Sequence, residues 1–175
     1  MYKYFFEGFN FSSLDCQQRH IQVTSMFPCK KVRYLKSPRG LTALSDQLPN
    51  NGYSGSMTVI PLRPKGSKVK FITTLNIERS TCTSSGARKR EAIKDIRSIL
   101  DEFDRMAIRN GFCAEINNMS RAYTISGQKL NFNLVFNAVD FEGTLIVQDP
   151  VLFKNVEESG MGSGKAYGMG LINVL

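Results

Sequence analysis

Two features of this 175-residue sequence carry residue types that could do chemistry: the single histidine, His20, and a glycine-rich loop from Gly160 to Gly170. An imidazole changes its charge near neutral pH, so His20 is suited to general acid–base catalysis. RNA can be cut without a metal when its 2′-hydroxyl attacks the adjacent phosphate, which needs an acid or base beside these oxygens and cations to stabilise the phosphorane. His20 with Lys165 of the loop is the smallest set that meets this need. A surface or core histidine without a catalytic role is the alternative.

The loop GMGSGKAYGMG does not match a site for a small nucleotide. Counting back from Gly164-Lys165 puts Ser159 where a P-loop needs its first glycine, and Ala166 stands where Ser or Thr would bind magnesium. The dinucleotide pattern GxGxxG fails in every register. A glycine backbone with free N–H groups and one lysine remains, which suits a sugar-phosphate chain. A loop that needs glycine only for its turns is the open alternative.

Charge is unevenly distributed along the chain. Residues 1–90 carry 15 Lys/Arg and 4 Asp/Glu, a net +11, whereas residues 91–175 carry 8 and 11, a net −3, which together give +8. A concentrated basic half is typical of a protein that binds a polyanion such as nucleic acid. A solvated basic face without a ligand is the other interpretation.

The four cysteines are widely spaced, and no CxxC pair or second histidine accompanies them. We therefore expect no metal site, no cofactor and no disulfide framework. Free cysteines of this kind are typical of a protein in the reducing cytoplasm. No apolar run approaches the ~20 residues of a membrane span.

Hydrophobic periodicity and helix-end signals predict the helices and strands that must position His20 and the loop. Asp15 and Gln18 predict the start of a helix that ends near Met26, before Pro28. Apolar residues on one helical face predict a second helix from Arg90 to Asn110, and residues 150–156 predict a short third one. Strands are predicted at 2–9, 31–35, 41–44, 56–62, 68–75, 112–116, 122–125, 131–137, 140–147 and 171–175, with 56–62 and 68–75 forming a hairpin.

This element order predicts an α+β protein of two tandem ferredoxin-like (RRM-like) domains, each with an antiparallel sheet. The expected boundaries are an N-terminal domain at 1–80 that carries His20, a basic linker at 81–90, and a C-terminal domain at 91–175 that ends in the glycine-rich loop.

Four stretches carry a family resemblance. The C-terminal stretch FEGTLIVQDPVLFKNVEESGMGSGKAYGMGLINV resembles the end of the CRISPR RAMP superfamily of repeat-RNA endoribonucleases, in particular its CasE branch, whose loop follows G-I-G-x-G-K-A-x-G-x-G-L-L. DCQQRHIQVTSMFP is similar to the family's D-x-Y-Q-L-H-x-x-L-W-x-L-F-P, LTALSDQLP to its V-L-V-L-S-x-x-x-P, and FDRMAIRNGF to its W-L-x-R-R-A-x-x-A-G-F. The matches span the chain.

The resemblance implies an enzyme that binds the stem-loop of a CRISPR repeat, cuts precursor crRNA at the 3′ base of the stem without metal, and leaves a 2′,3′-cyclic phosphate and a 5′-hydroxyl. It also implies that the enzyme stays on the crRNA hairpin within an effector complex of other subunits. His20 maps onto the family's catalytic histidine, and Lys165 maps onto the loop lysine that contacts the RNA backbone. We expect these two side chains to face each other across the scissile phosphate.

Gln17 departs from the family, which usually has tyrosine at this position to hold the scissile phosphate. An amide can still donate a hydrogen bond to phosphate, and Tyr167 could substitute for the missing phenol. The chain has no tryptophan, and FITTLNIER keeps Asn76 but lacks two arginines of the family's F-R-L-R-A-N-P. These departures are compatible with a type I-E enzyme or with a CasE-like enzyme of a type IV plasmid system.

Basic side chains and the loop are the expected RNA contacts, because A-form RNA is recognised mainly through its shape and phosphates. Arg88, Lys89 and Arg90 would bind the stem from the linker, and Arg121 and Lys129 flank a hairpin that could enter its groove. The contacts expected near the cut are Arg19, Lys30, Lys31, Arg33, Gly160, Gly162, Ser163, Gly164 and Gly168.

Two other functions stay open. A catalytically weak RAMP subunit could bind the crRNA hairpin structurally, and the Gln17 departure leaves this alternative open. An unrelated RRM-like binder of single-stranded RNA lacks support, because no K/R-G-F/Y-G/A-F pattern is present.

Overall fold

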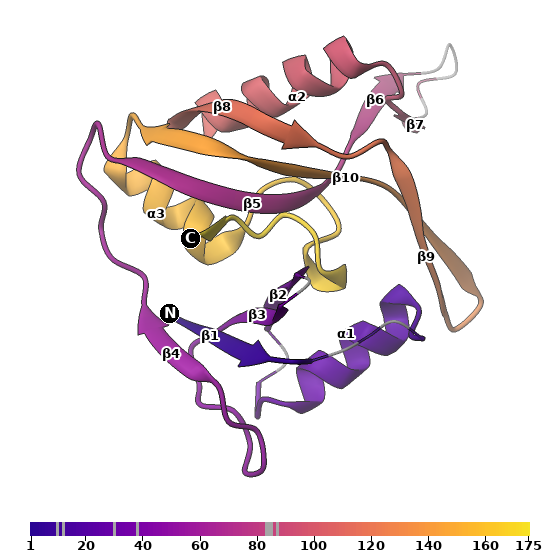
Figure 1. Ribbon diagram of the computed structural model, residues 1–175. Helices are drawn as coiled ribbons and strands as arrows, with labels where there is room; N and C mark the ends of the chain where they lie inside the picture. Colours follow the sequence, from indigo (N-terminus) through magenta and orange to yellow (C-terminus); the bar gives the residue numbers. More distant parts are fainter. Residues whose placement is uncertain (10, 12, 30, 38, 83–85, 87) are drawn as a thin grey trace.

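The computed structural model describes residues 1–175 except 10, 12, 30, 38, 83–85 and 87, with residue 88 described by its backbone alone (Figure 1). The chain forms eleven strands, three α-helices and one 3-10 helix among these residues. In chain order they are β1 (Tyr2–Glu7), α1 (Cys16–Ser25), β2 (Arg33–Ser37), β3 (Gly40–Ser45), β4 (Ser56–Val59), β5 (Lys68–Asn76), β6 (Glu78–Cys82), β7 (Arg88–Ala92), α2 (Ile96–Arg109), β8 (Phe112–Met119), β9 (Tyr123–Lys129), β10 (Phe132–Val147), α3 (Pro150–Ser159), η1 (Lys165–Tyr167) and β11 (Asn173–Val174).

The first sheet has the strand order β2-β3-β1-β4, and all of its pairs are antiparallel. The order of elements β1, α1, β2, β3, β4 gives a ferredoxin-like unit in which the final strand lies beside the first. Residues 46–55, between β3 and β4, contain no helix, so α1 alone covers this sheet. α1 packs through Val23 and Met26 against one face, where Tyr4 and Phe6 are buried.

The second sheet repeats this arrangement with the order β11-β5-β10-β8, and β9 pairs with the first half of β10. α2 and α3 pack on the same face of the sheet. Phe103 of α2 lies 4.7 Å from Phe141 between ring centroids, and Phe153 of α3 lies 5.5 Å from Phe112. The two sheets together confirm the predicted tandem ferredoxin-like fold, although no sequence repeat marks the duplication.

The uncovered faces of the two sheets meet where the chain crosses between them. Leu35 and Leu44 of the first sheet, Ile60 of the connection and Leu171 of the C-terminal segment form a small buried cluster, against which Ile72 of the second sheet packs. Beyond this cluster the sheets diverge, with the C-terminal segment between them (Figure 1).

The predicted hairpin of residues 56–62 and 68–75 is wrong. β4 pairs with β1, whereas β5 pairs with β10 and β11 in the other sheet. Alternation of apolar residues identifies a strand but not its partner, and the turn between them instead carries the chain from one sheet to the other. Because β5 belongs to the second sheet, the boundary expected at 81–90 lies earlier, in residues 60–67.

The basic segment expected as a linker is an antiparallel hairpin of β6 and β7, inserted between β5 and α2. The predicted start of the second helix at Arg90 is therefore wrong. β7 ends at Ala92, and Asp95 caps α2, because its side chain accepts a hydrogen bond from the backbone N–H of Ser98 at 2.8 Å. The predicted C-terminus at Asn110, followed by Gly111 with a φ of +78°, is confirmed.

Candidate active site

His20 lies in the middle of α1, whose start is fixed by a capping box. The Asp15 side chain accepts from the backbone N–H of Gln18 at 2.8 Å, and the Gln18 side chain accepts from the backbone N–H of Asp15 at 2.9 Å. The helix also lies against Gly127 of β9, where an added Cβ would come within 2.6 Å of Cys16 Sγ and 3.0 Å of Gln17 N. α1 is therefore held by the first sheet on one side and by the β9–β10 hairpin on the other.

Tyr167 of η1 brings the glycine-rich loop to His20. The ring centroids of His20 and Tyr167 are 5.5 Å apart, with planes tilted by 57°. On its other side, Tyr167 packs on Phe136 of β10, with ring centroids 5.2 Å apart. Residues from three distant parts of the sequence therefore form a continuous row of rings, and this row limits the orientations that the imidazole can adopt.

The glycine-rich loop is bonded through its backbone to the second sheet and packs closely against the first. Gly170 N donates to Thr74 O of β5 at 2.7 Å, and Met161 N donates to Gly170 O at 2.8 Å, which closes the base of the loop. Gly168 has a φ of +85°, and a Cβ there would come within 2.8 Å of the Tyr34 ring. Glycine at this position therefore serves both the backbone conformation and the close approach to β2.

Asn76 ties the loop to the second sheet. Its Nδ2 donates to Ser163 Oγ at 2.9 Å, and its Oδ1 accepts from Asn137 N at 2.8 Å. Asn76 is buried, and its two polar groups are engaged, one with the loop and one with β10, rather than exposed to a ligand.

Lys165 is half-buried, and its ammonium donates to Gly160 O at 2.9 Å. Burial lowers the pKa of Lys165, and the positive charge of nearby Arg33 lowers it further. No hydrogen bond between Lys165 and His20 is found among the described residues, and the loop side chain that contacts the imidazole is Tyr167. The facing of Lys165 and His20 across a phosphate stays a prediction.

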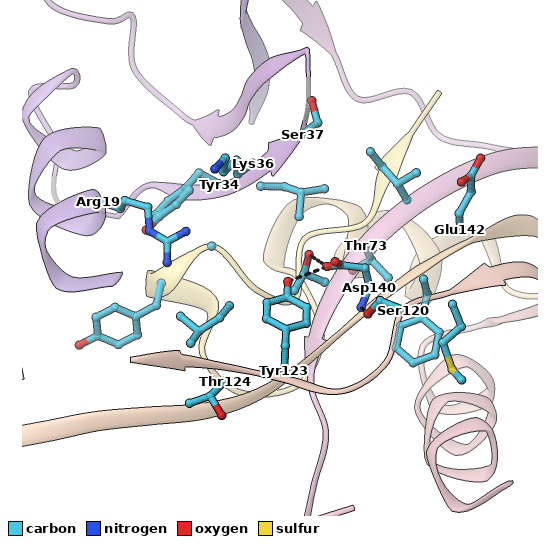
Figure 2. A pocket seen from close by; sticks show the side chains of 18 of the residues that line it. Arg19, Tyr34, Lys36, Ser37, Thr73, Ser120, Tyr123, Thr124, Asp140 and Glu142 are labelled. Atoms are coloured by element: carbon cyan, nitrogen blue, oxygen red, sulfur yellow. Dashed lines mark hydrogen bonds between the residues drawn. The ribbon is translucent and has the colours of Figure 1, made fainter. Parts of the chain in front are cut away.

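A cleft of about 880 Å³ opens beside this centre, between the diverging sheets (Figure 2). Arg19 and Tyr34 line it from the first unit, and Tyr123 and Asp140 line it from the second. Tyr123 Oη donates to Asp140 Oδ1 at 2.9 Å, and Thr74 Oγ1 donates to the same oxygen at 2.6 Å. Burial, and then the Asp140 carboxylate, raise the pKa of the Tyr123 phenol, so this hydroxyl stays protonated.

Basic residues predicted to contact RNA fall into three groups. Arg19 lines the cleft beside His20, Lys31 is exposed, and Arg33 donates to Glu158 O at 3.3 Å, so it also supports α3. Arg121, in the connection between β8 and β9, and Lys129, at the end of β9, are exposed.

The third group belongs to the β6–β7 hairpin, where Lys89 and Arg90 are exposed and Lys89 pairs with Glu91 at 3.0 Å. Arg88 opens β7, and Lys30 lies outside the described residues. The first two groups share the surroundings of α1, because β9 contacts that helix. The third lies beside the start of α2 (Figure 1).

Sequence reasoning missed Phe136, Tyr34, Tyr123 and Asp140. Each was assigned only to a strand, because alternation shows that a residue points to one face but not what it meets there. The four free cysteines are one buried thiol, Cys16, and three at least partly exposed ones. No group of three or more His, Cys, Asp or Glu side chains suited to hold a metal ion occurs in the described part of the chain. Within that part, no helix is long and apolar enough to cross a membrane.

Comparison with solved structures places the fold. The chain is similar to CRISPR endoribonuclease Cse3 bound to 19 nt RNA (TM-score 0.73, 18% identity, 99% of both chains covered). It is also similar to Thermus thermophilus Cse3 bound to an RNA representing a pre-cleavage complex (0.72, 19%, 99% of this chain and 98% of that one). A third similar chain comes from a CRISPR RNA-guided surveillance complex in a pre-nicking state (0.71, 15%, 99% and 98%). At these identities the likeness establishes the fold.

Comparison with curated proteins gave no match. The model of a protein family described as CRISPR associated protein matches residues 12–175, which include α1, the cleft and the glycine-rich loop. The chain therefore belongs to this family of CRISPR associated proteins.

Proposed function

We propose that this protein is an endoribonuclease that binds the stem-loop of a CRISPR repeat, cuts precursor crRNA at the 3′ base of the stem, and stays on the mature hairpin within an effector complex. The observation that carries the proposal is the contact of His20 with Tyr167, which puts the only imidazole of the chain against the glycine-rich loop. The proteins of similar fold include an endoribonuclease bound to RNA and a subunit of an RNA-guided complex, which supports the same substrate and partners.

In the proposed reaction, His20 acts through Nε2, because Nδ1 is buried. It takes the proton of the 2′-hydroxyl as the 2′-oxygen attacks phosphorus. The bond from phosphorus to the 5′-oxygen then breaks, and that oxygen receives a proton. The products are a 2′,3′-cyclic phosphate and a 5′-hydroxyl, and no step needs a metal ion.

Lys165 is the proposed source of the positive charge at the phosphorane. One of its three N–H groups is engaged by Gly160 O, which leaves two for phosphate oxygens. Because burial lowers its pKa, the ammonium gives up a proton more readily than an exposed lysine, so Lys165 is also suited to protonate the leaving oxygen. Arg19 adds a second cation from the turn of α1 that carries His20.

The β6–β7 and β9–β10 hairpins are the proposed contacts for the stem. Lys89, Arg90 and Lys129 on these hairpins, and Arg121 just before β9, are exposed cations compatible with binding to phosphates. The residue that holds the scissile phosphate in related enzymes is replaced by Gln17, and we propose that the phenol of Tyr167 takes this part.

Cleavage of the cognate repeat RNA in EDTA tests the proposal. The wild-type protein should make one cut, and His20→Ala should lose the cut while it retains hairpin binding. A 2′-deoxy substitution at the nucleotide before the cut should block wild-type cleavage but not binding, because it removes the attacking hydroxyl. Cutting of the deoxy substrate would show a mechanism with an external nucleophile.

A second function is a catalytically weak subunit that binds the crRNA hairpin structurally. The engagement of Lys165 by Gly160 O and the amide at position 17 favour it. Tight binding of the repeat RNA without any cut by the wild-type protein would support this function over the first.

A further inference from the structure

Three side-chain atoms on α1 are buried and have no hydrogen-bond partner among the described residues: Gln17 Oε1, His20 Nδ1 and Gln22 Oε1. Buried polar atoms in folded proteins nearly always have a partner, and one without a partner is costly. Two of the three atoms belong to residues in the same turn of helix, and one of those residues is the proposed catalytic base. The cluster therefore bears on how the imidazole is held.

Helix geometry brings Gln17 and His20 together and keeps Gln22 apart. Residues three apart lie on one face of a helix, whereas residues two apart do not. Side chains also lean toward the N-terminus of their helix, so the His20 ring leans back over the turn that carries Gln17. Tyr167 contacts the same ring, which limits the orientations open to it.

We propose that Gln17 is a positioning residue whose side-chain carbonyl, unpartnered within the described part of the structure, turns to accept a hydrogen bond from Nδ1–H of His20. This bond fixes the neutral imidazole with its proton on Nδ1 and its lone pair on Nε2. The consequence for cleavage rests on the proposed function, since Nε2 is the atom that would take the proton of the 2′-hydroxyl. Gln17 thus acts through His20, as the partner that orients a catalytic histidine does in other enzymes.

No ion pair of His20 occurs in the described structure, so a carboxylate does not already orient the imidazole. The ionisable groups on α1 are Cys16 and Arg19, with Asp15 engaged at the N-terminus of the helix. Those on the elements packed against α1 are Lys165 and Tyr167 of η1, Tyr123 and Lys129 of β9, and Tyr2, Lys3, Tyr4, Glu7, Arg33, Tyr34 and Lys36 of the first sheet. Glu7 is the one carboxylate among these, and it alternates with Tyr4 and Phe6, so it lies on the face of β1 that points away from α1. A carboxylate introduced at position 17 would therefore be the only one beside the imidazole from these elements.

The single histidine allows a direct test without RNA. In protein labelled with ¹⁵N-histidine, the two imidazole nitrogens give shifts that identify the tautomer. Wild-type protein at a pH where His20 is neutral should show the Nδ1–H form. The Nε2–H form in the wild type would overturn the proposal, because it would mean that Nδ1 accepts a bond, as it would from the amide NH₂ of Gln17.

Three variants extend the test. Gln17→Glu keeps the acceptor and adds a charge, so it should keep the Nδ1–H form and raise the measured midpoint of the His20 titration by about one pH unit. Gln17→Leu should shift the neutral imidazole toward Nε2–H. Gln22→Leu is the matched control, since it removes an equally buried and unpartnered carbonyl from the same helix, and it should leave the tautomer and the titration as in the wild type.

Cleavage separates this inference from the function on which it rests. In single-turnover assays, Gln17→Leu should cut at least about tenfold more slowly than Gln22→Leu with equal RNA affinity, as expected for a displaced general base. If the tautomer behaves as expected but the wild-type protein does not cut RNA, the positioning stands and the proposed function fails. If Gln17→Leu and Gln22→Leu leave the tautomer equally unchanged, the positioning fails whatever the cleavage shows.

Discussion

The row of rings formed by His20, Tyr167 and Phe136 makes a prediction about position 167. Tyr167→Ala removes two aromatic contacts, with ring centroids at 5.5 Å and 5.2 Å. Aromatic pairs contribute about 0.5–1.5 kcal/mol each, so about 1–3 kcal/mol of orienting energy is at stake. If all of this energy serves to hold the imidazole in its reactive position, Tyr167→Ala should slow cleavage by about 5- to 150-fold.

The variant Tyr167→Phe separates the contribution of the ring from that of the hydroxyl. It keeps both ring contacts and removes only the proposed hydrogen bond to phosphate, which contributes about 1 kcal/mol and hence about fivefold in rate. The assay is single-turnover cleavage of the repeat RNA at saturating protein, with RNA affinity measured separately. Tyr167→Ala that cuts at the wild-type rate would refute the orienting role. Tyr167→Phe at the wild-type rate would rule out the hydroxyl as a substitute for the missing tyrosine.

Three further predictions concern RNA affinity and stability. Lys89→Glu with Arg90→Glu should weaken hairpin binding and lower the salt slope by about 0.7–0.9 for each phosphate that the variant no longer binds. Arg63→Met should lower the free energy of unfolding by about 3–5 kcal/mol in chemical unfolding, because it leaves the buried Glu157 carboxylate without its ion-pair partner. Glu157 is 5% exposed and accepts two hydrogen bonds from Arg63, at 3.1 and 3.2 Å. Gly168→Ala should cost about 1–3 kcal/mol in the same assay, since its φ is +85° and a Cβ meets an aromatic ring at 2.8 Å.

Two of these predictions have a matched control variant. Lys65→Glu with Lys68→Glu makes the same charge change at the far end of β5 from the β6–β7 hairpin, and an equal loss of affinity there would show a general charge effect. Gly52 also has a positive φ, of +97°, but no atom lies within 4 Å of the Cβ that Gly52→Ala would add. A cost at Gly168 no larger than at Gly52 would refute the close contact.

The pH dependence of Arg63→Met follows from the sign of the shift. Burial raises the pKa of Glu157, and Arg63 opposes that rise. Without Arg63 the folded-state pKa lies further above the unfolded-state value, so the folded state binds the proton more tightly. The variant should therefore lose stability, relative to wild type, as pH rises through the interval between the two values, and recover it at lower pH. A deficit that grows as pH falls would contradict this account.

The sequence predicted the fold through local signals that the structure satisfies. The Asp15–Gln18 capping box and Gly111 after the second helix were correct, and so was the order of strands and helices apart from β6 and β7, which lie where a linker was expected. Strand pairing was less predictable, because β5 has the alternation of a hairpin partner of β4 but pairs with β10, about 60–80 residues further along. The same limit explains why residues 90–92 were taken as helix rather than as the end of β7.

The candidate site was predictable in its chemistry but not in its contacts. His20 and the loop stand out by residue type, since the chain has one histidine and five of its fourteen glycines lie between residues 160 and 170. The role of Phe136 as the support of Tyr167 could not be inferred, because it depends on how the β9–β10 hairpin folds over α1. The engagement of Lys165 by Gly160 O likewise arises from left-handed turns that a sequence pattern does not specify.

The most direct test of the account is the identity of the ends that the protein makes on its own repeat RNA in EDTA. We predict one product ending in a 2′,3′-cyclic phosphate and one beginning with a 5′-hydroxyl, both absent with His20→Ala although the RNA remains bound. Product ends with a 5′-phosphate, or the same products from His20→Ala at the wild-type rate, would contradict it.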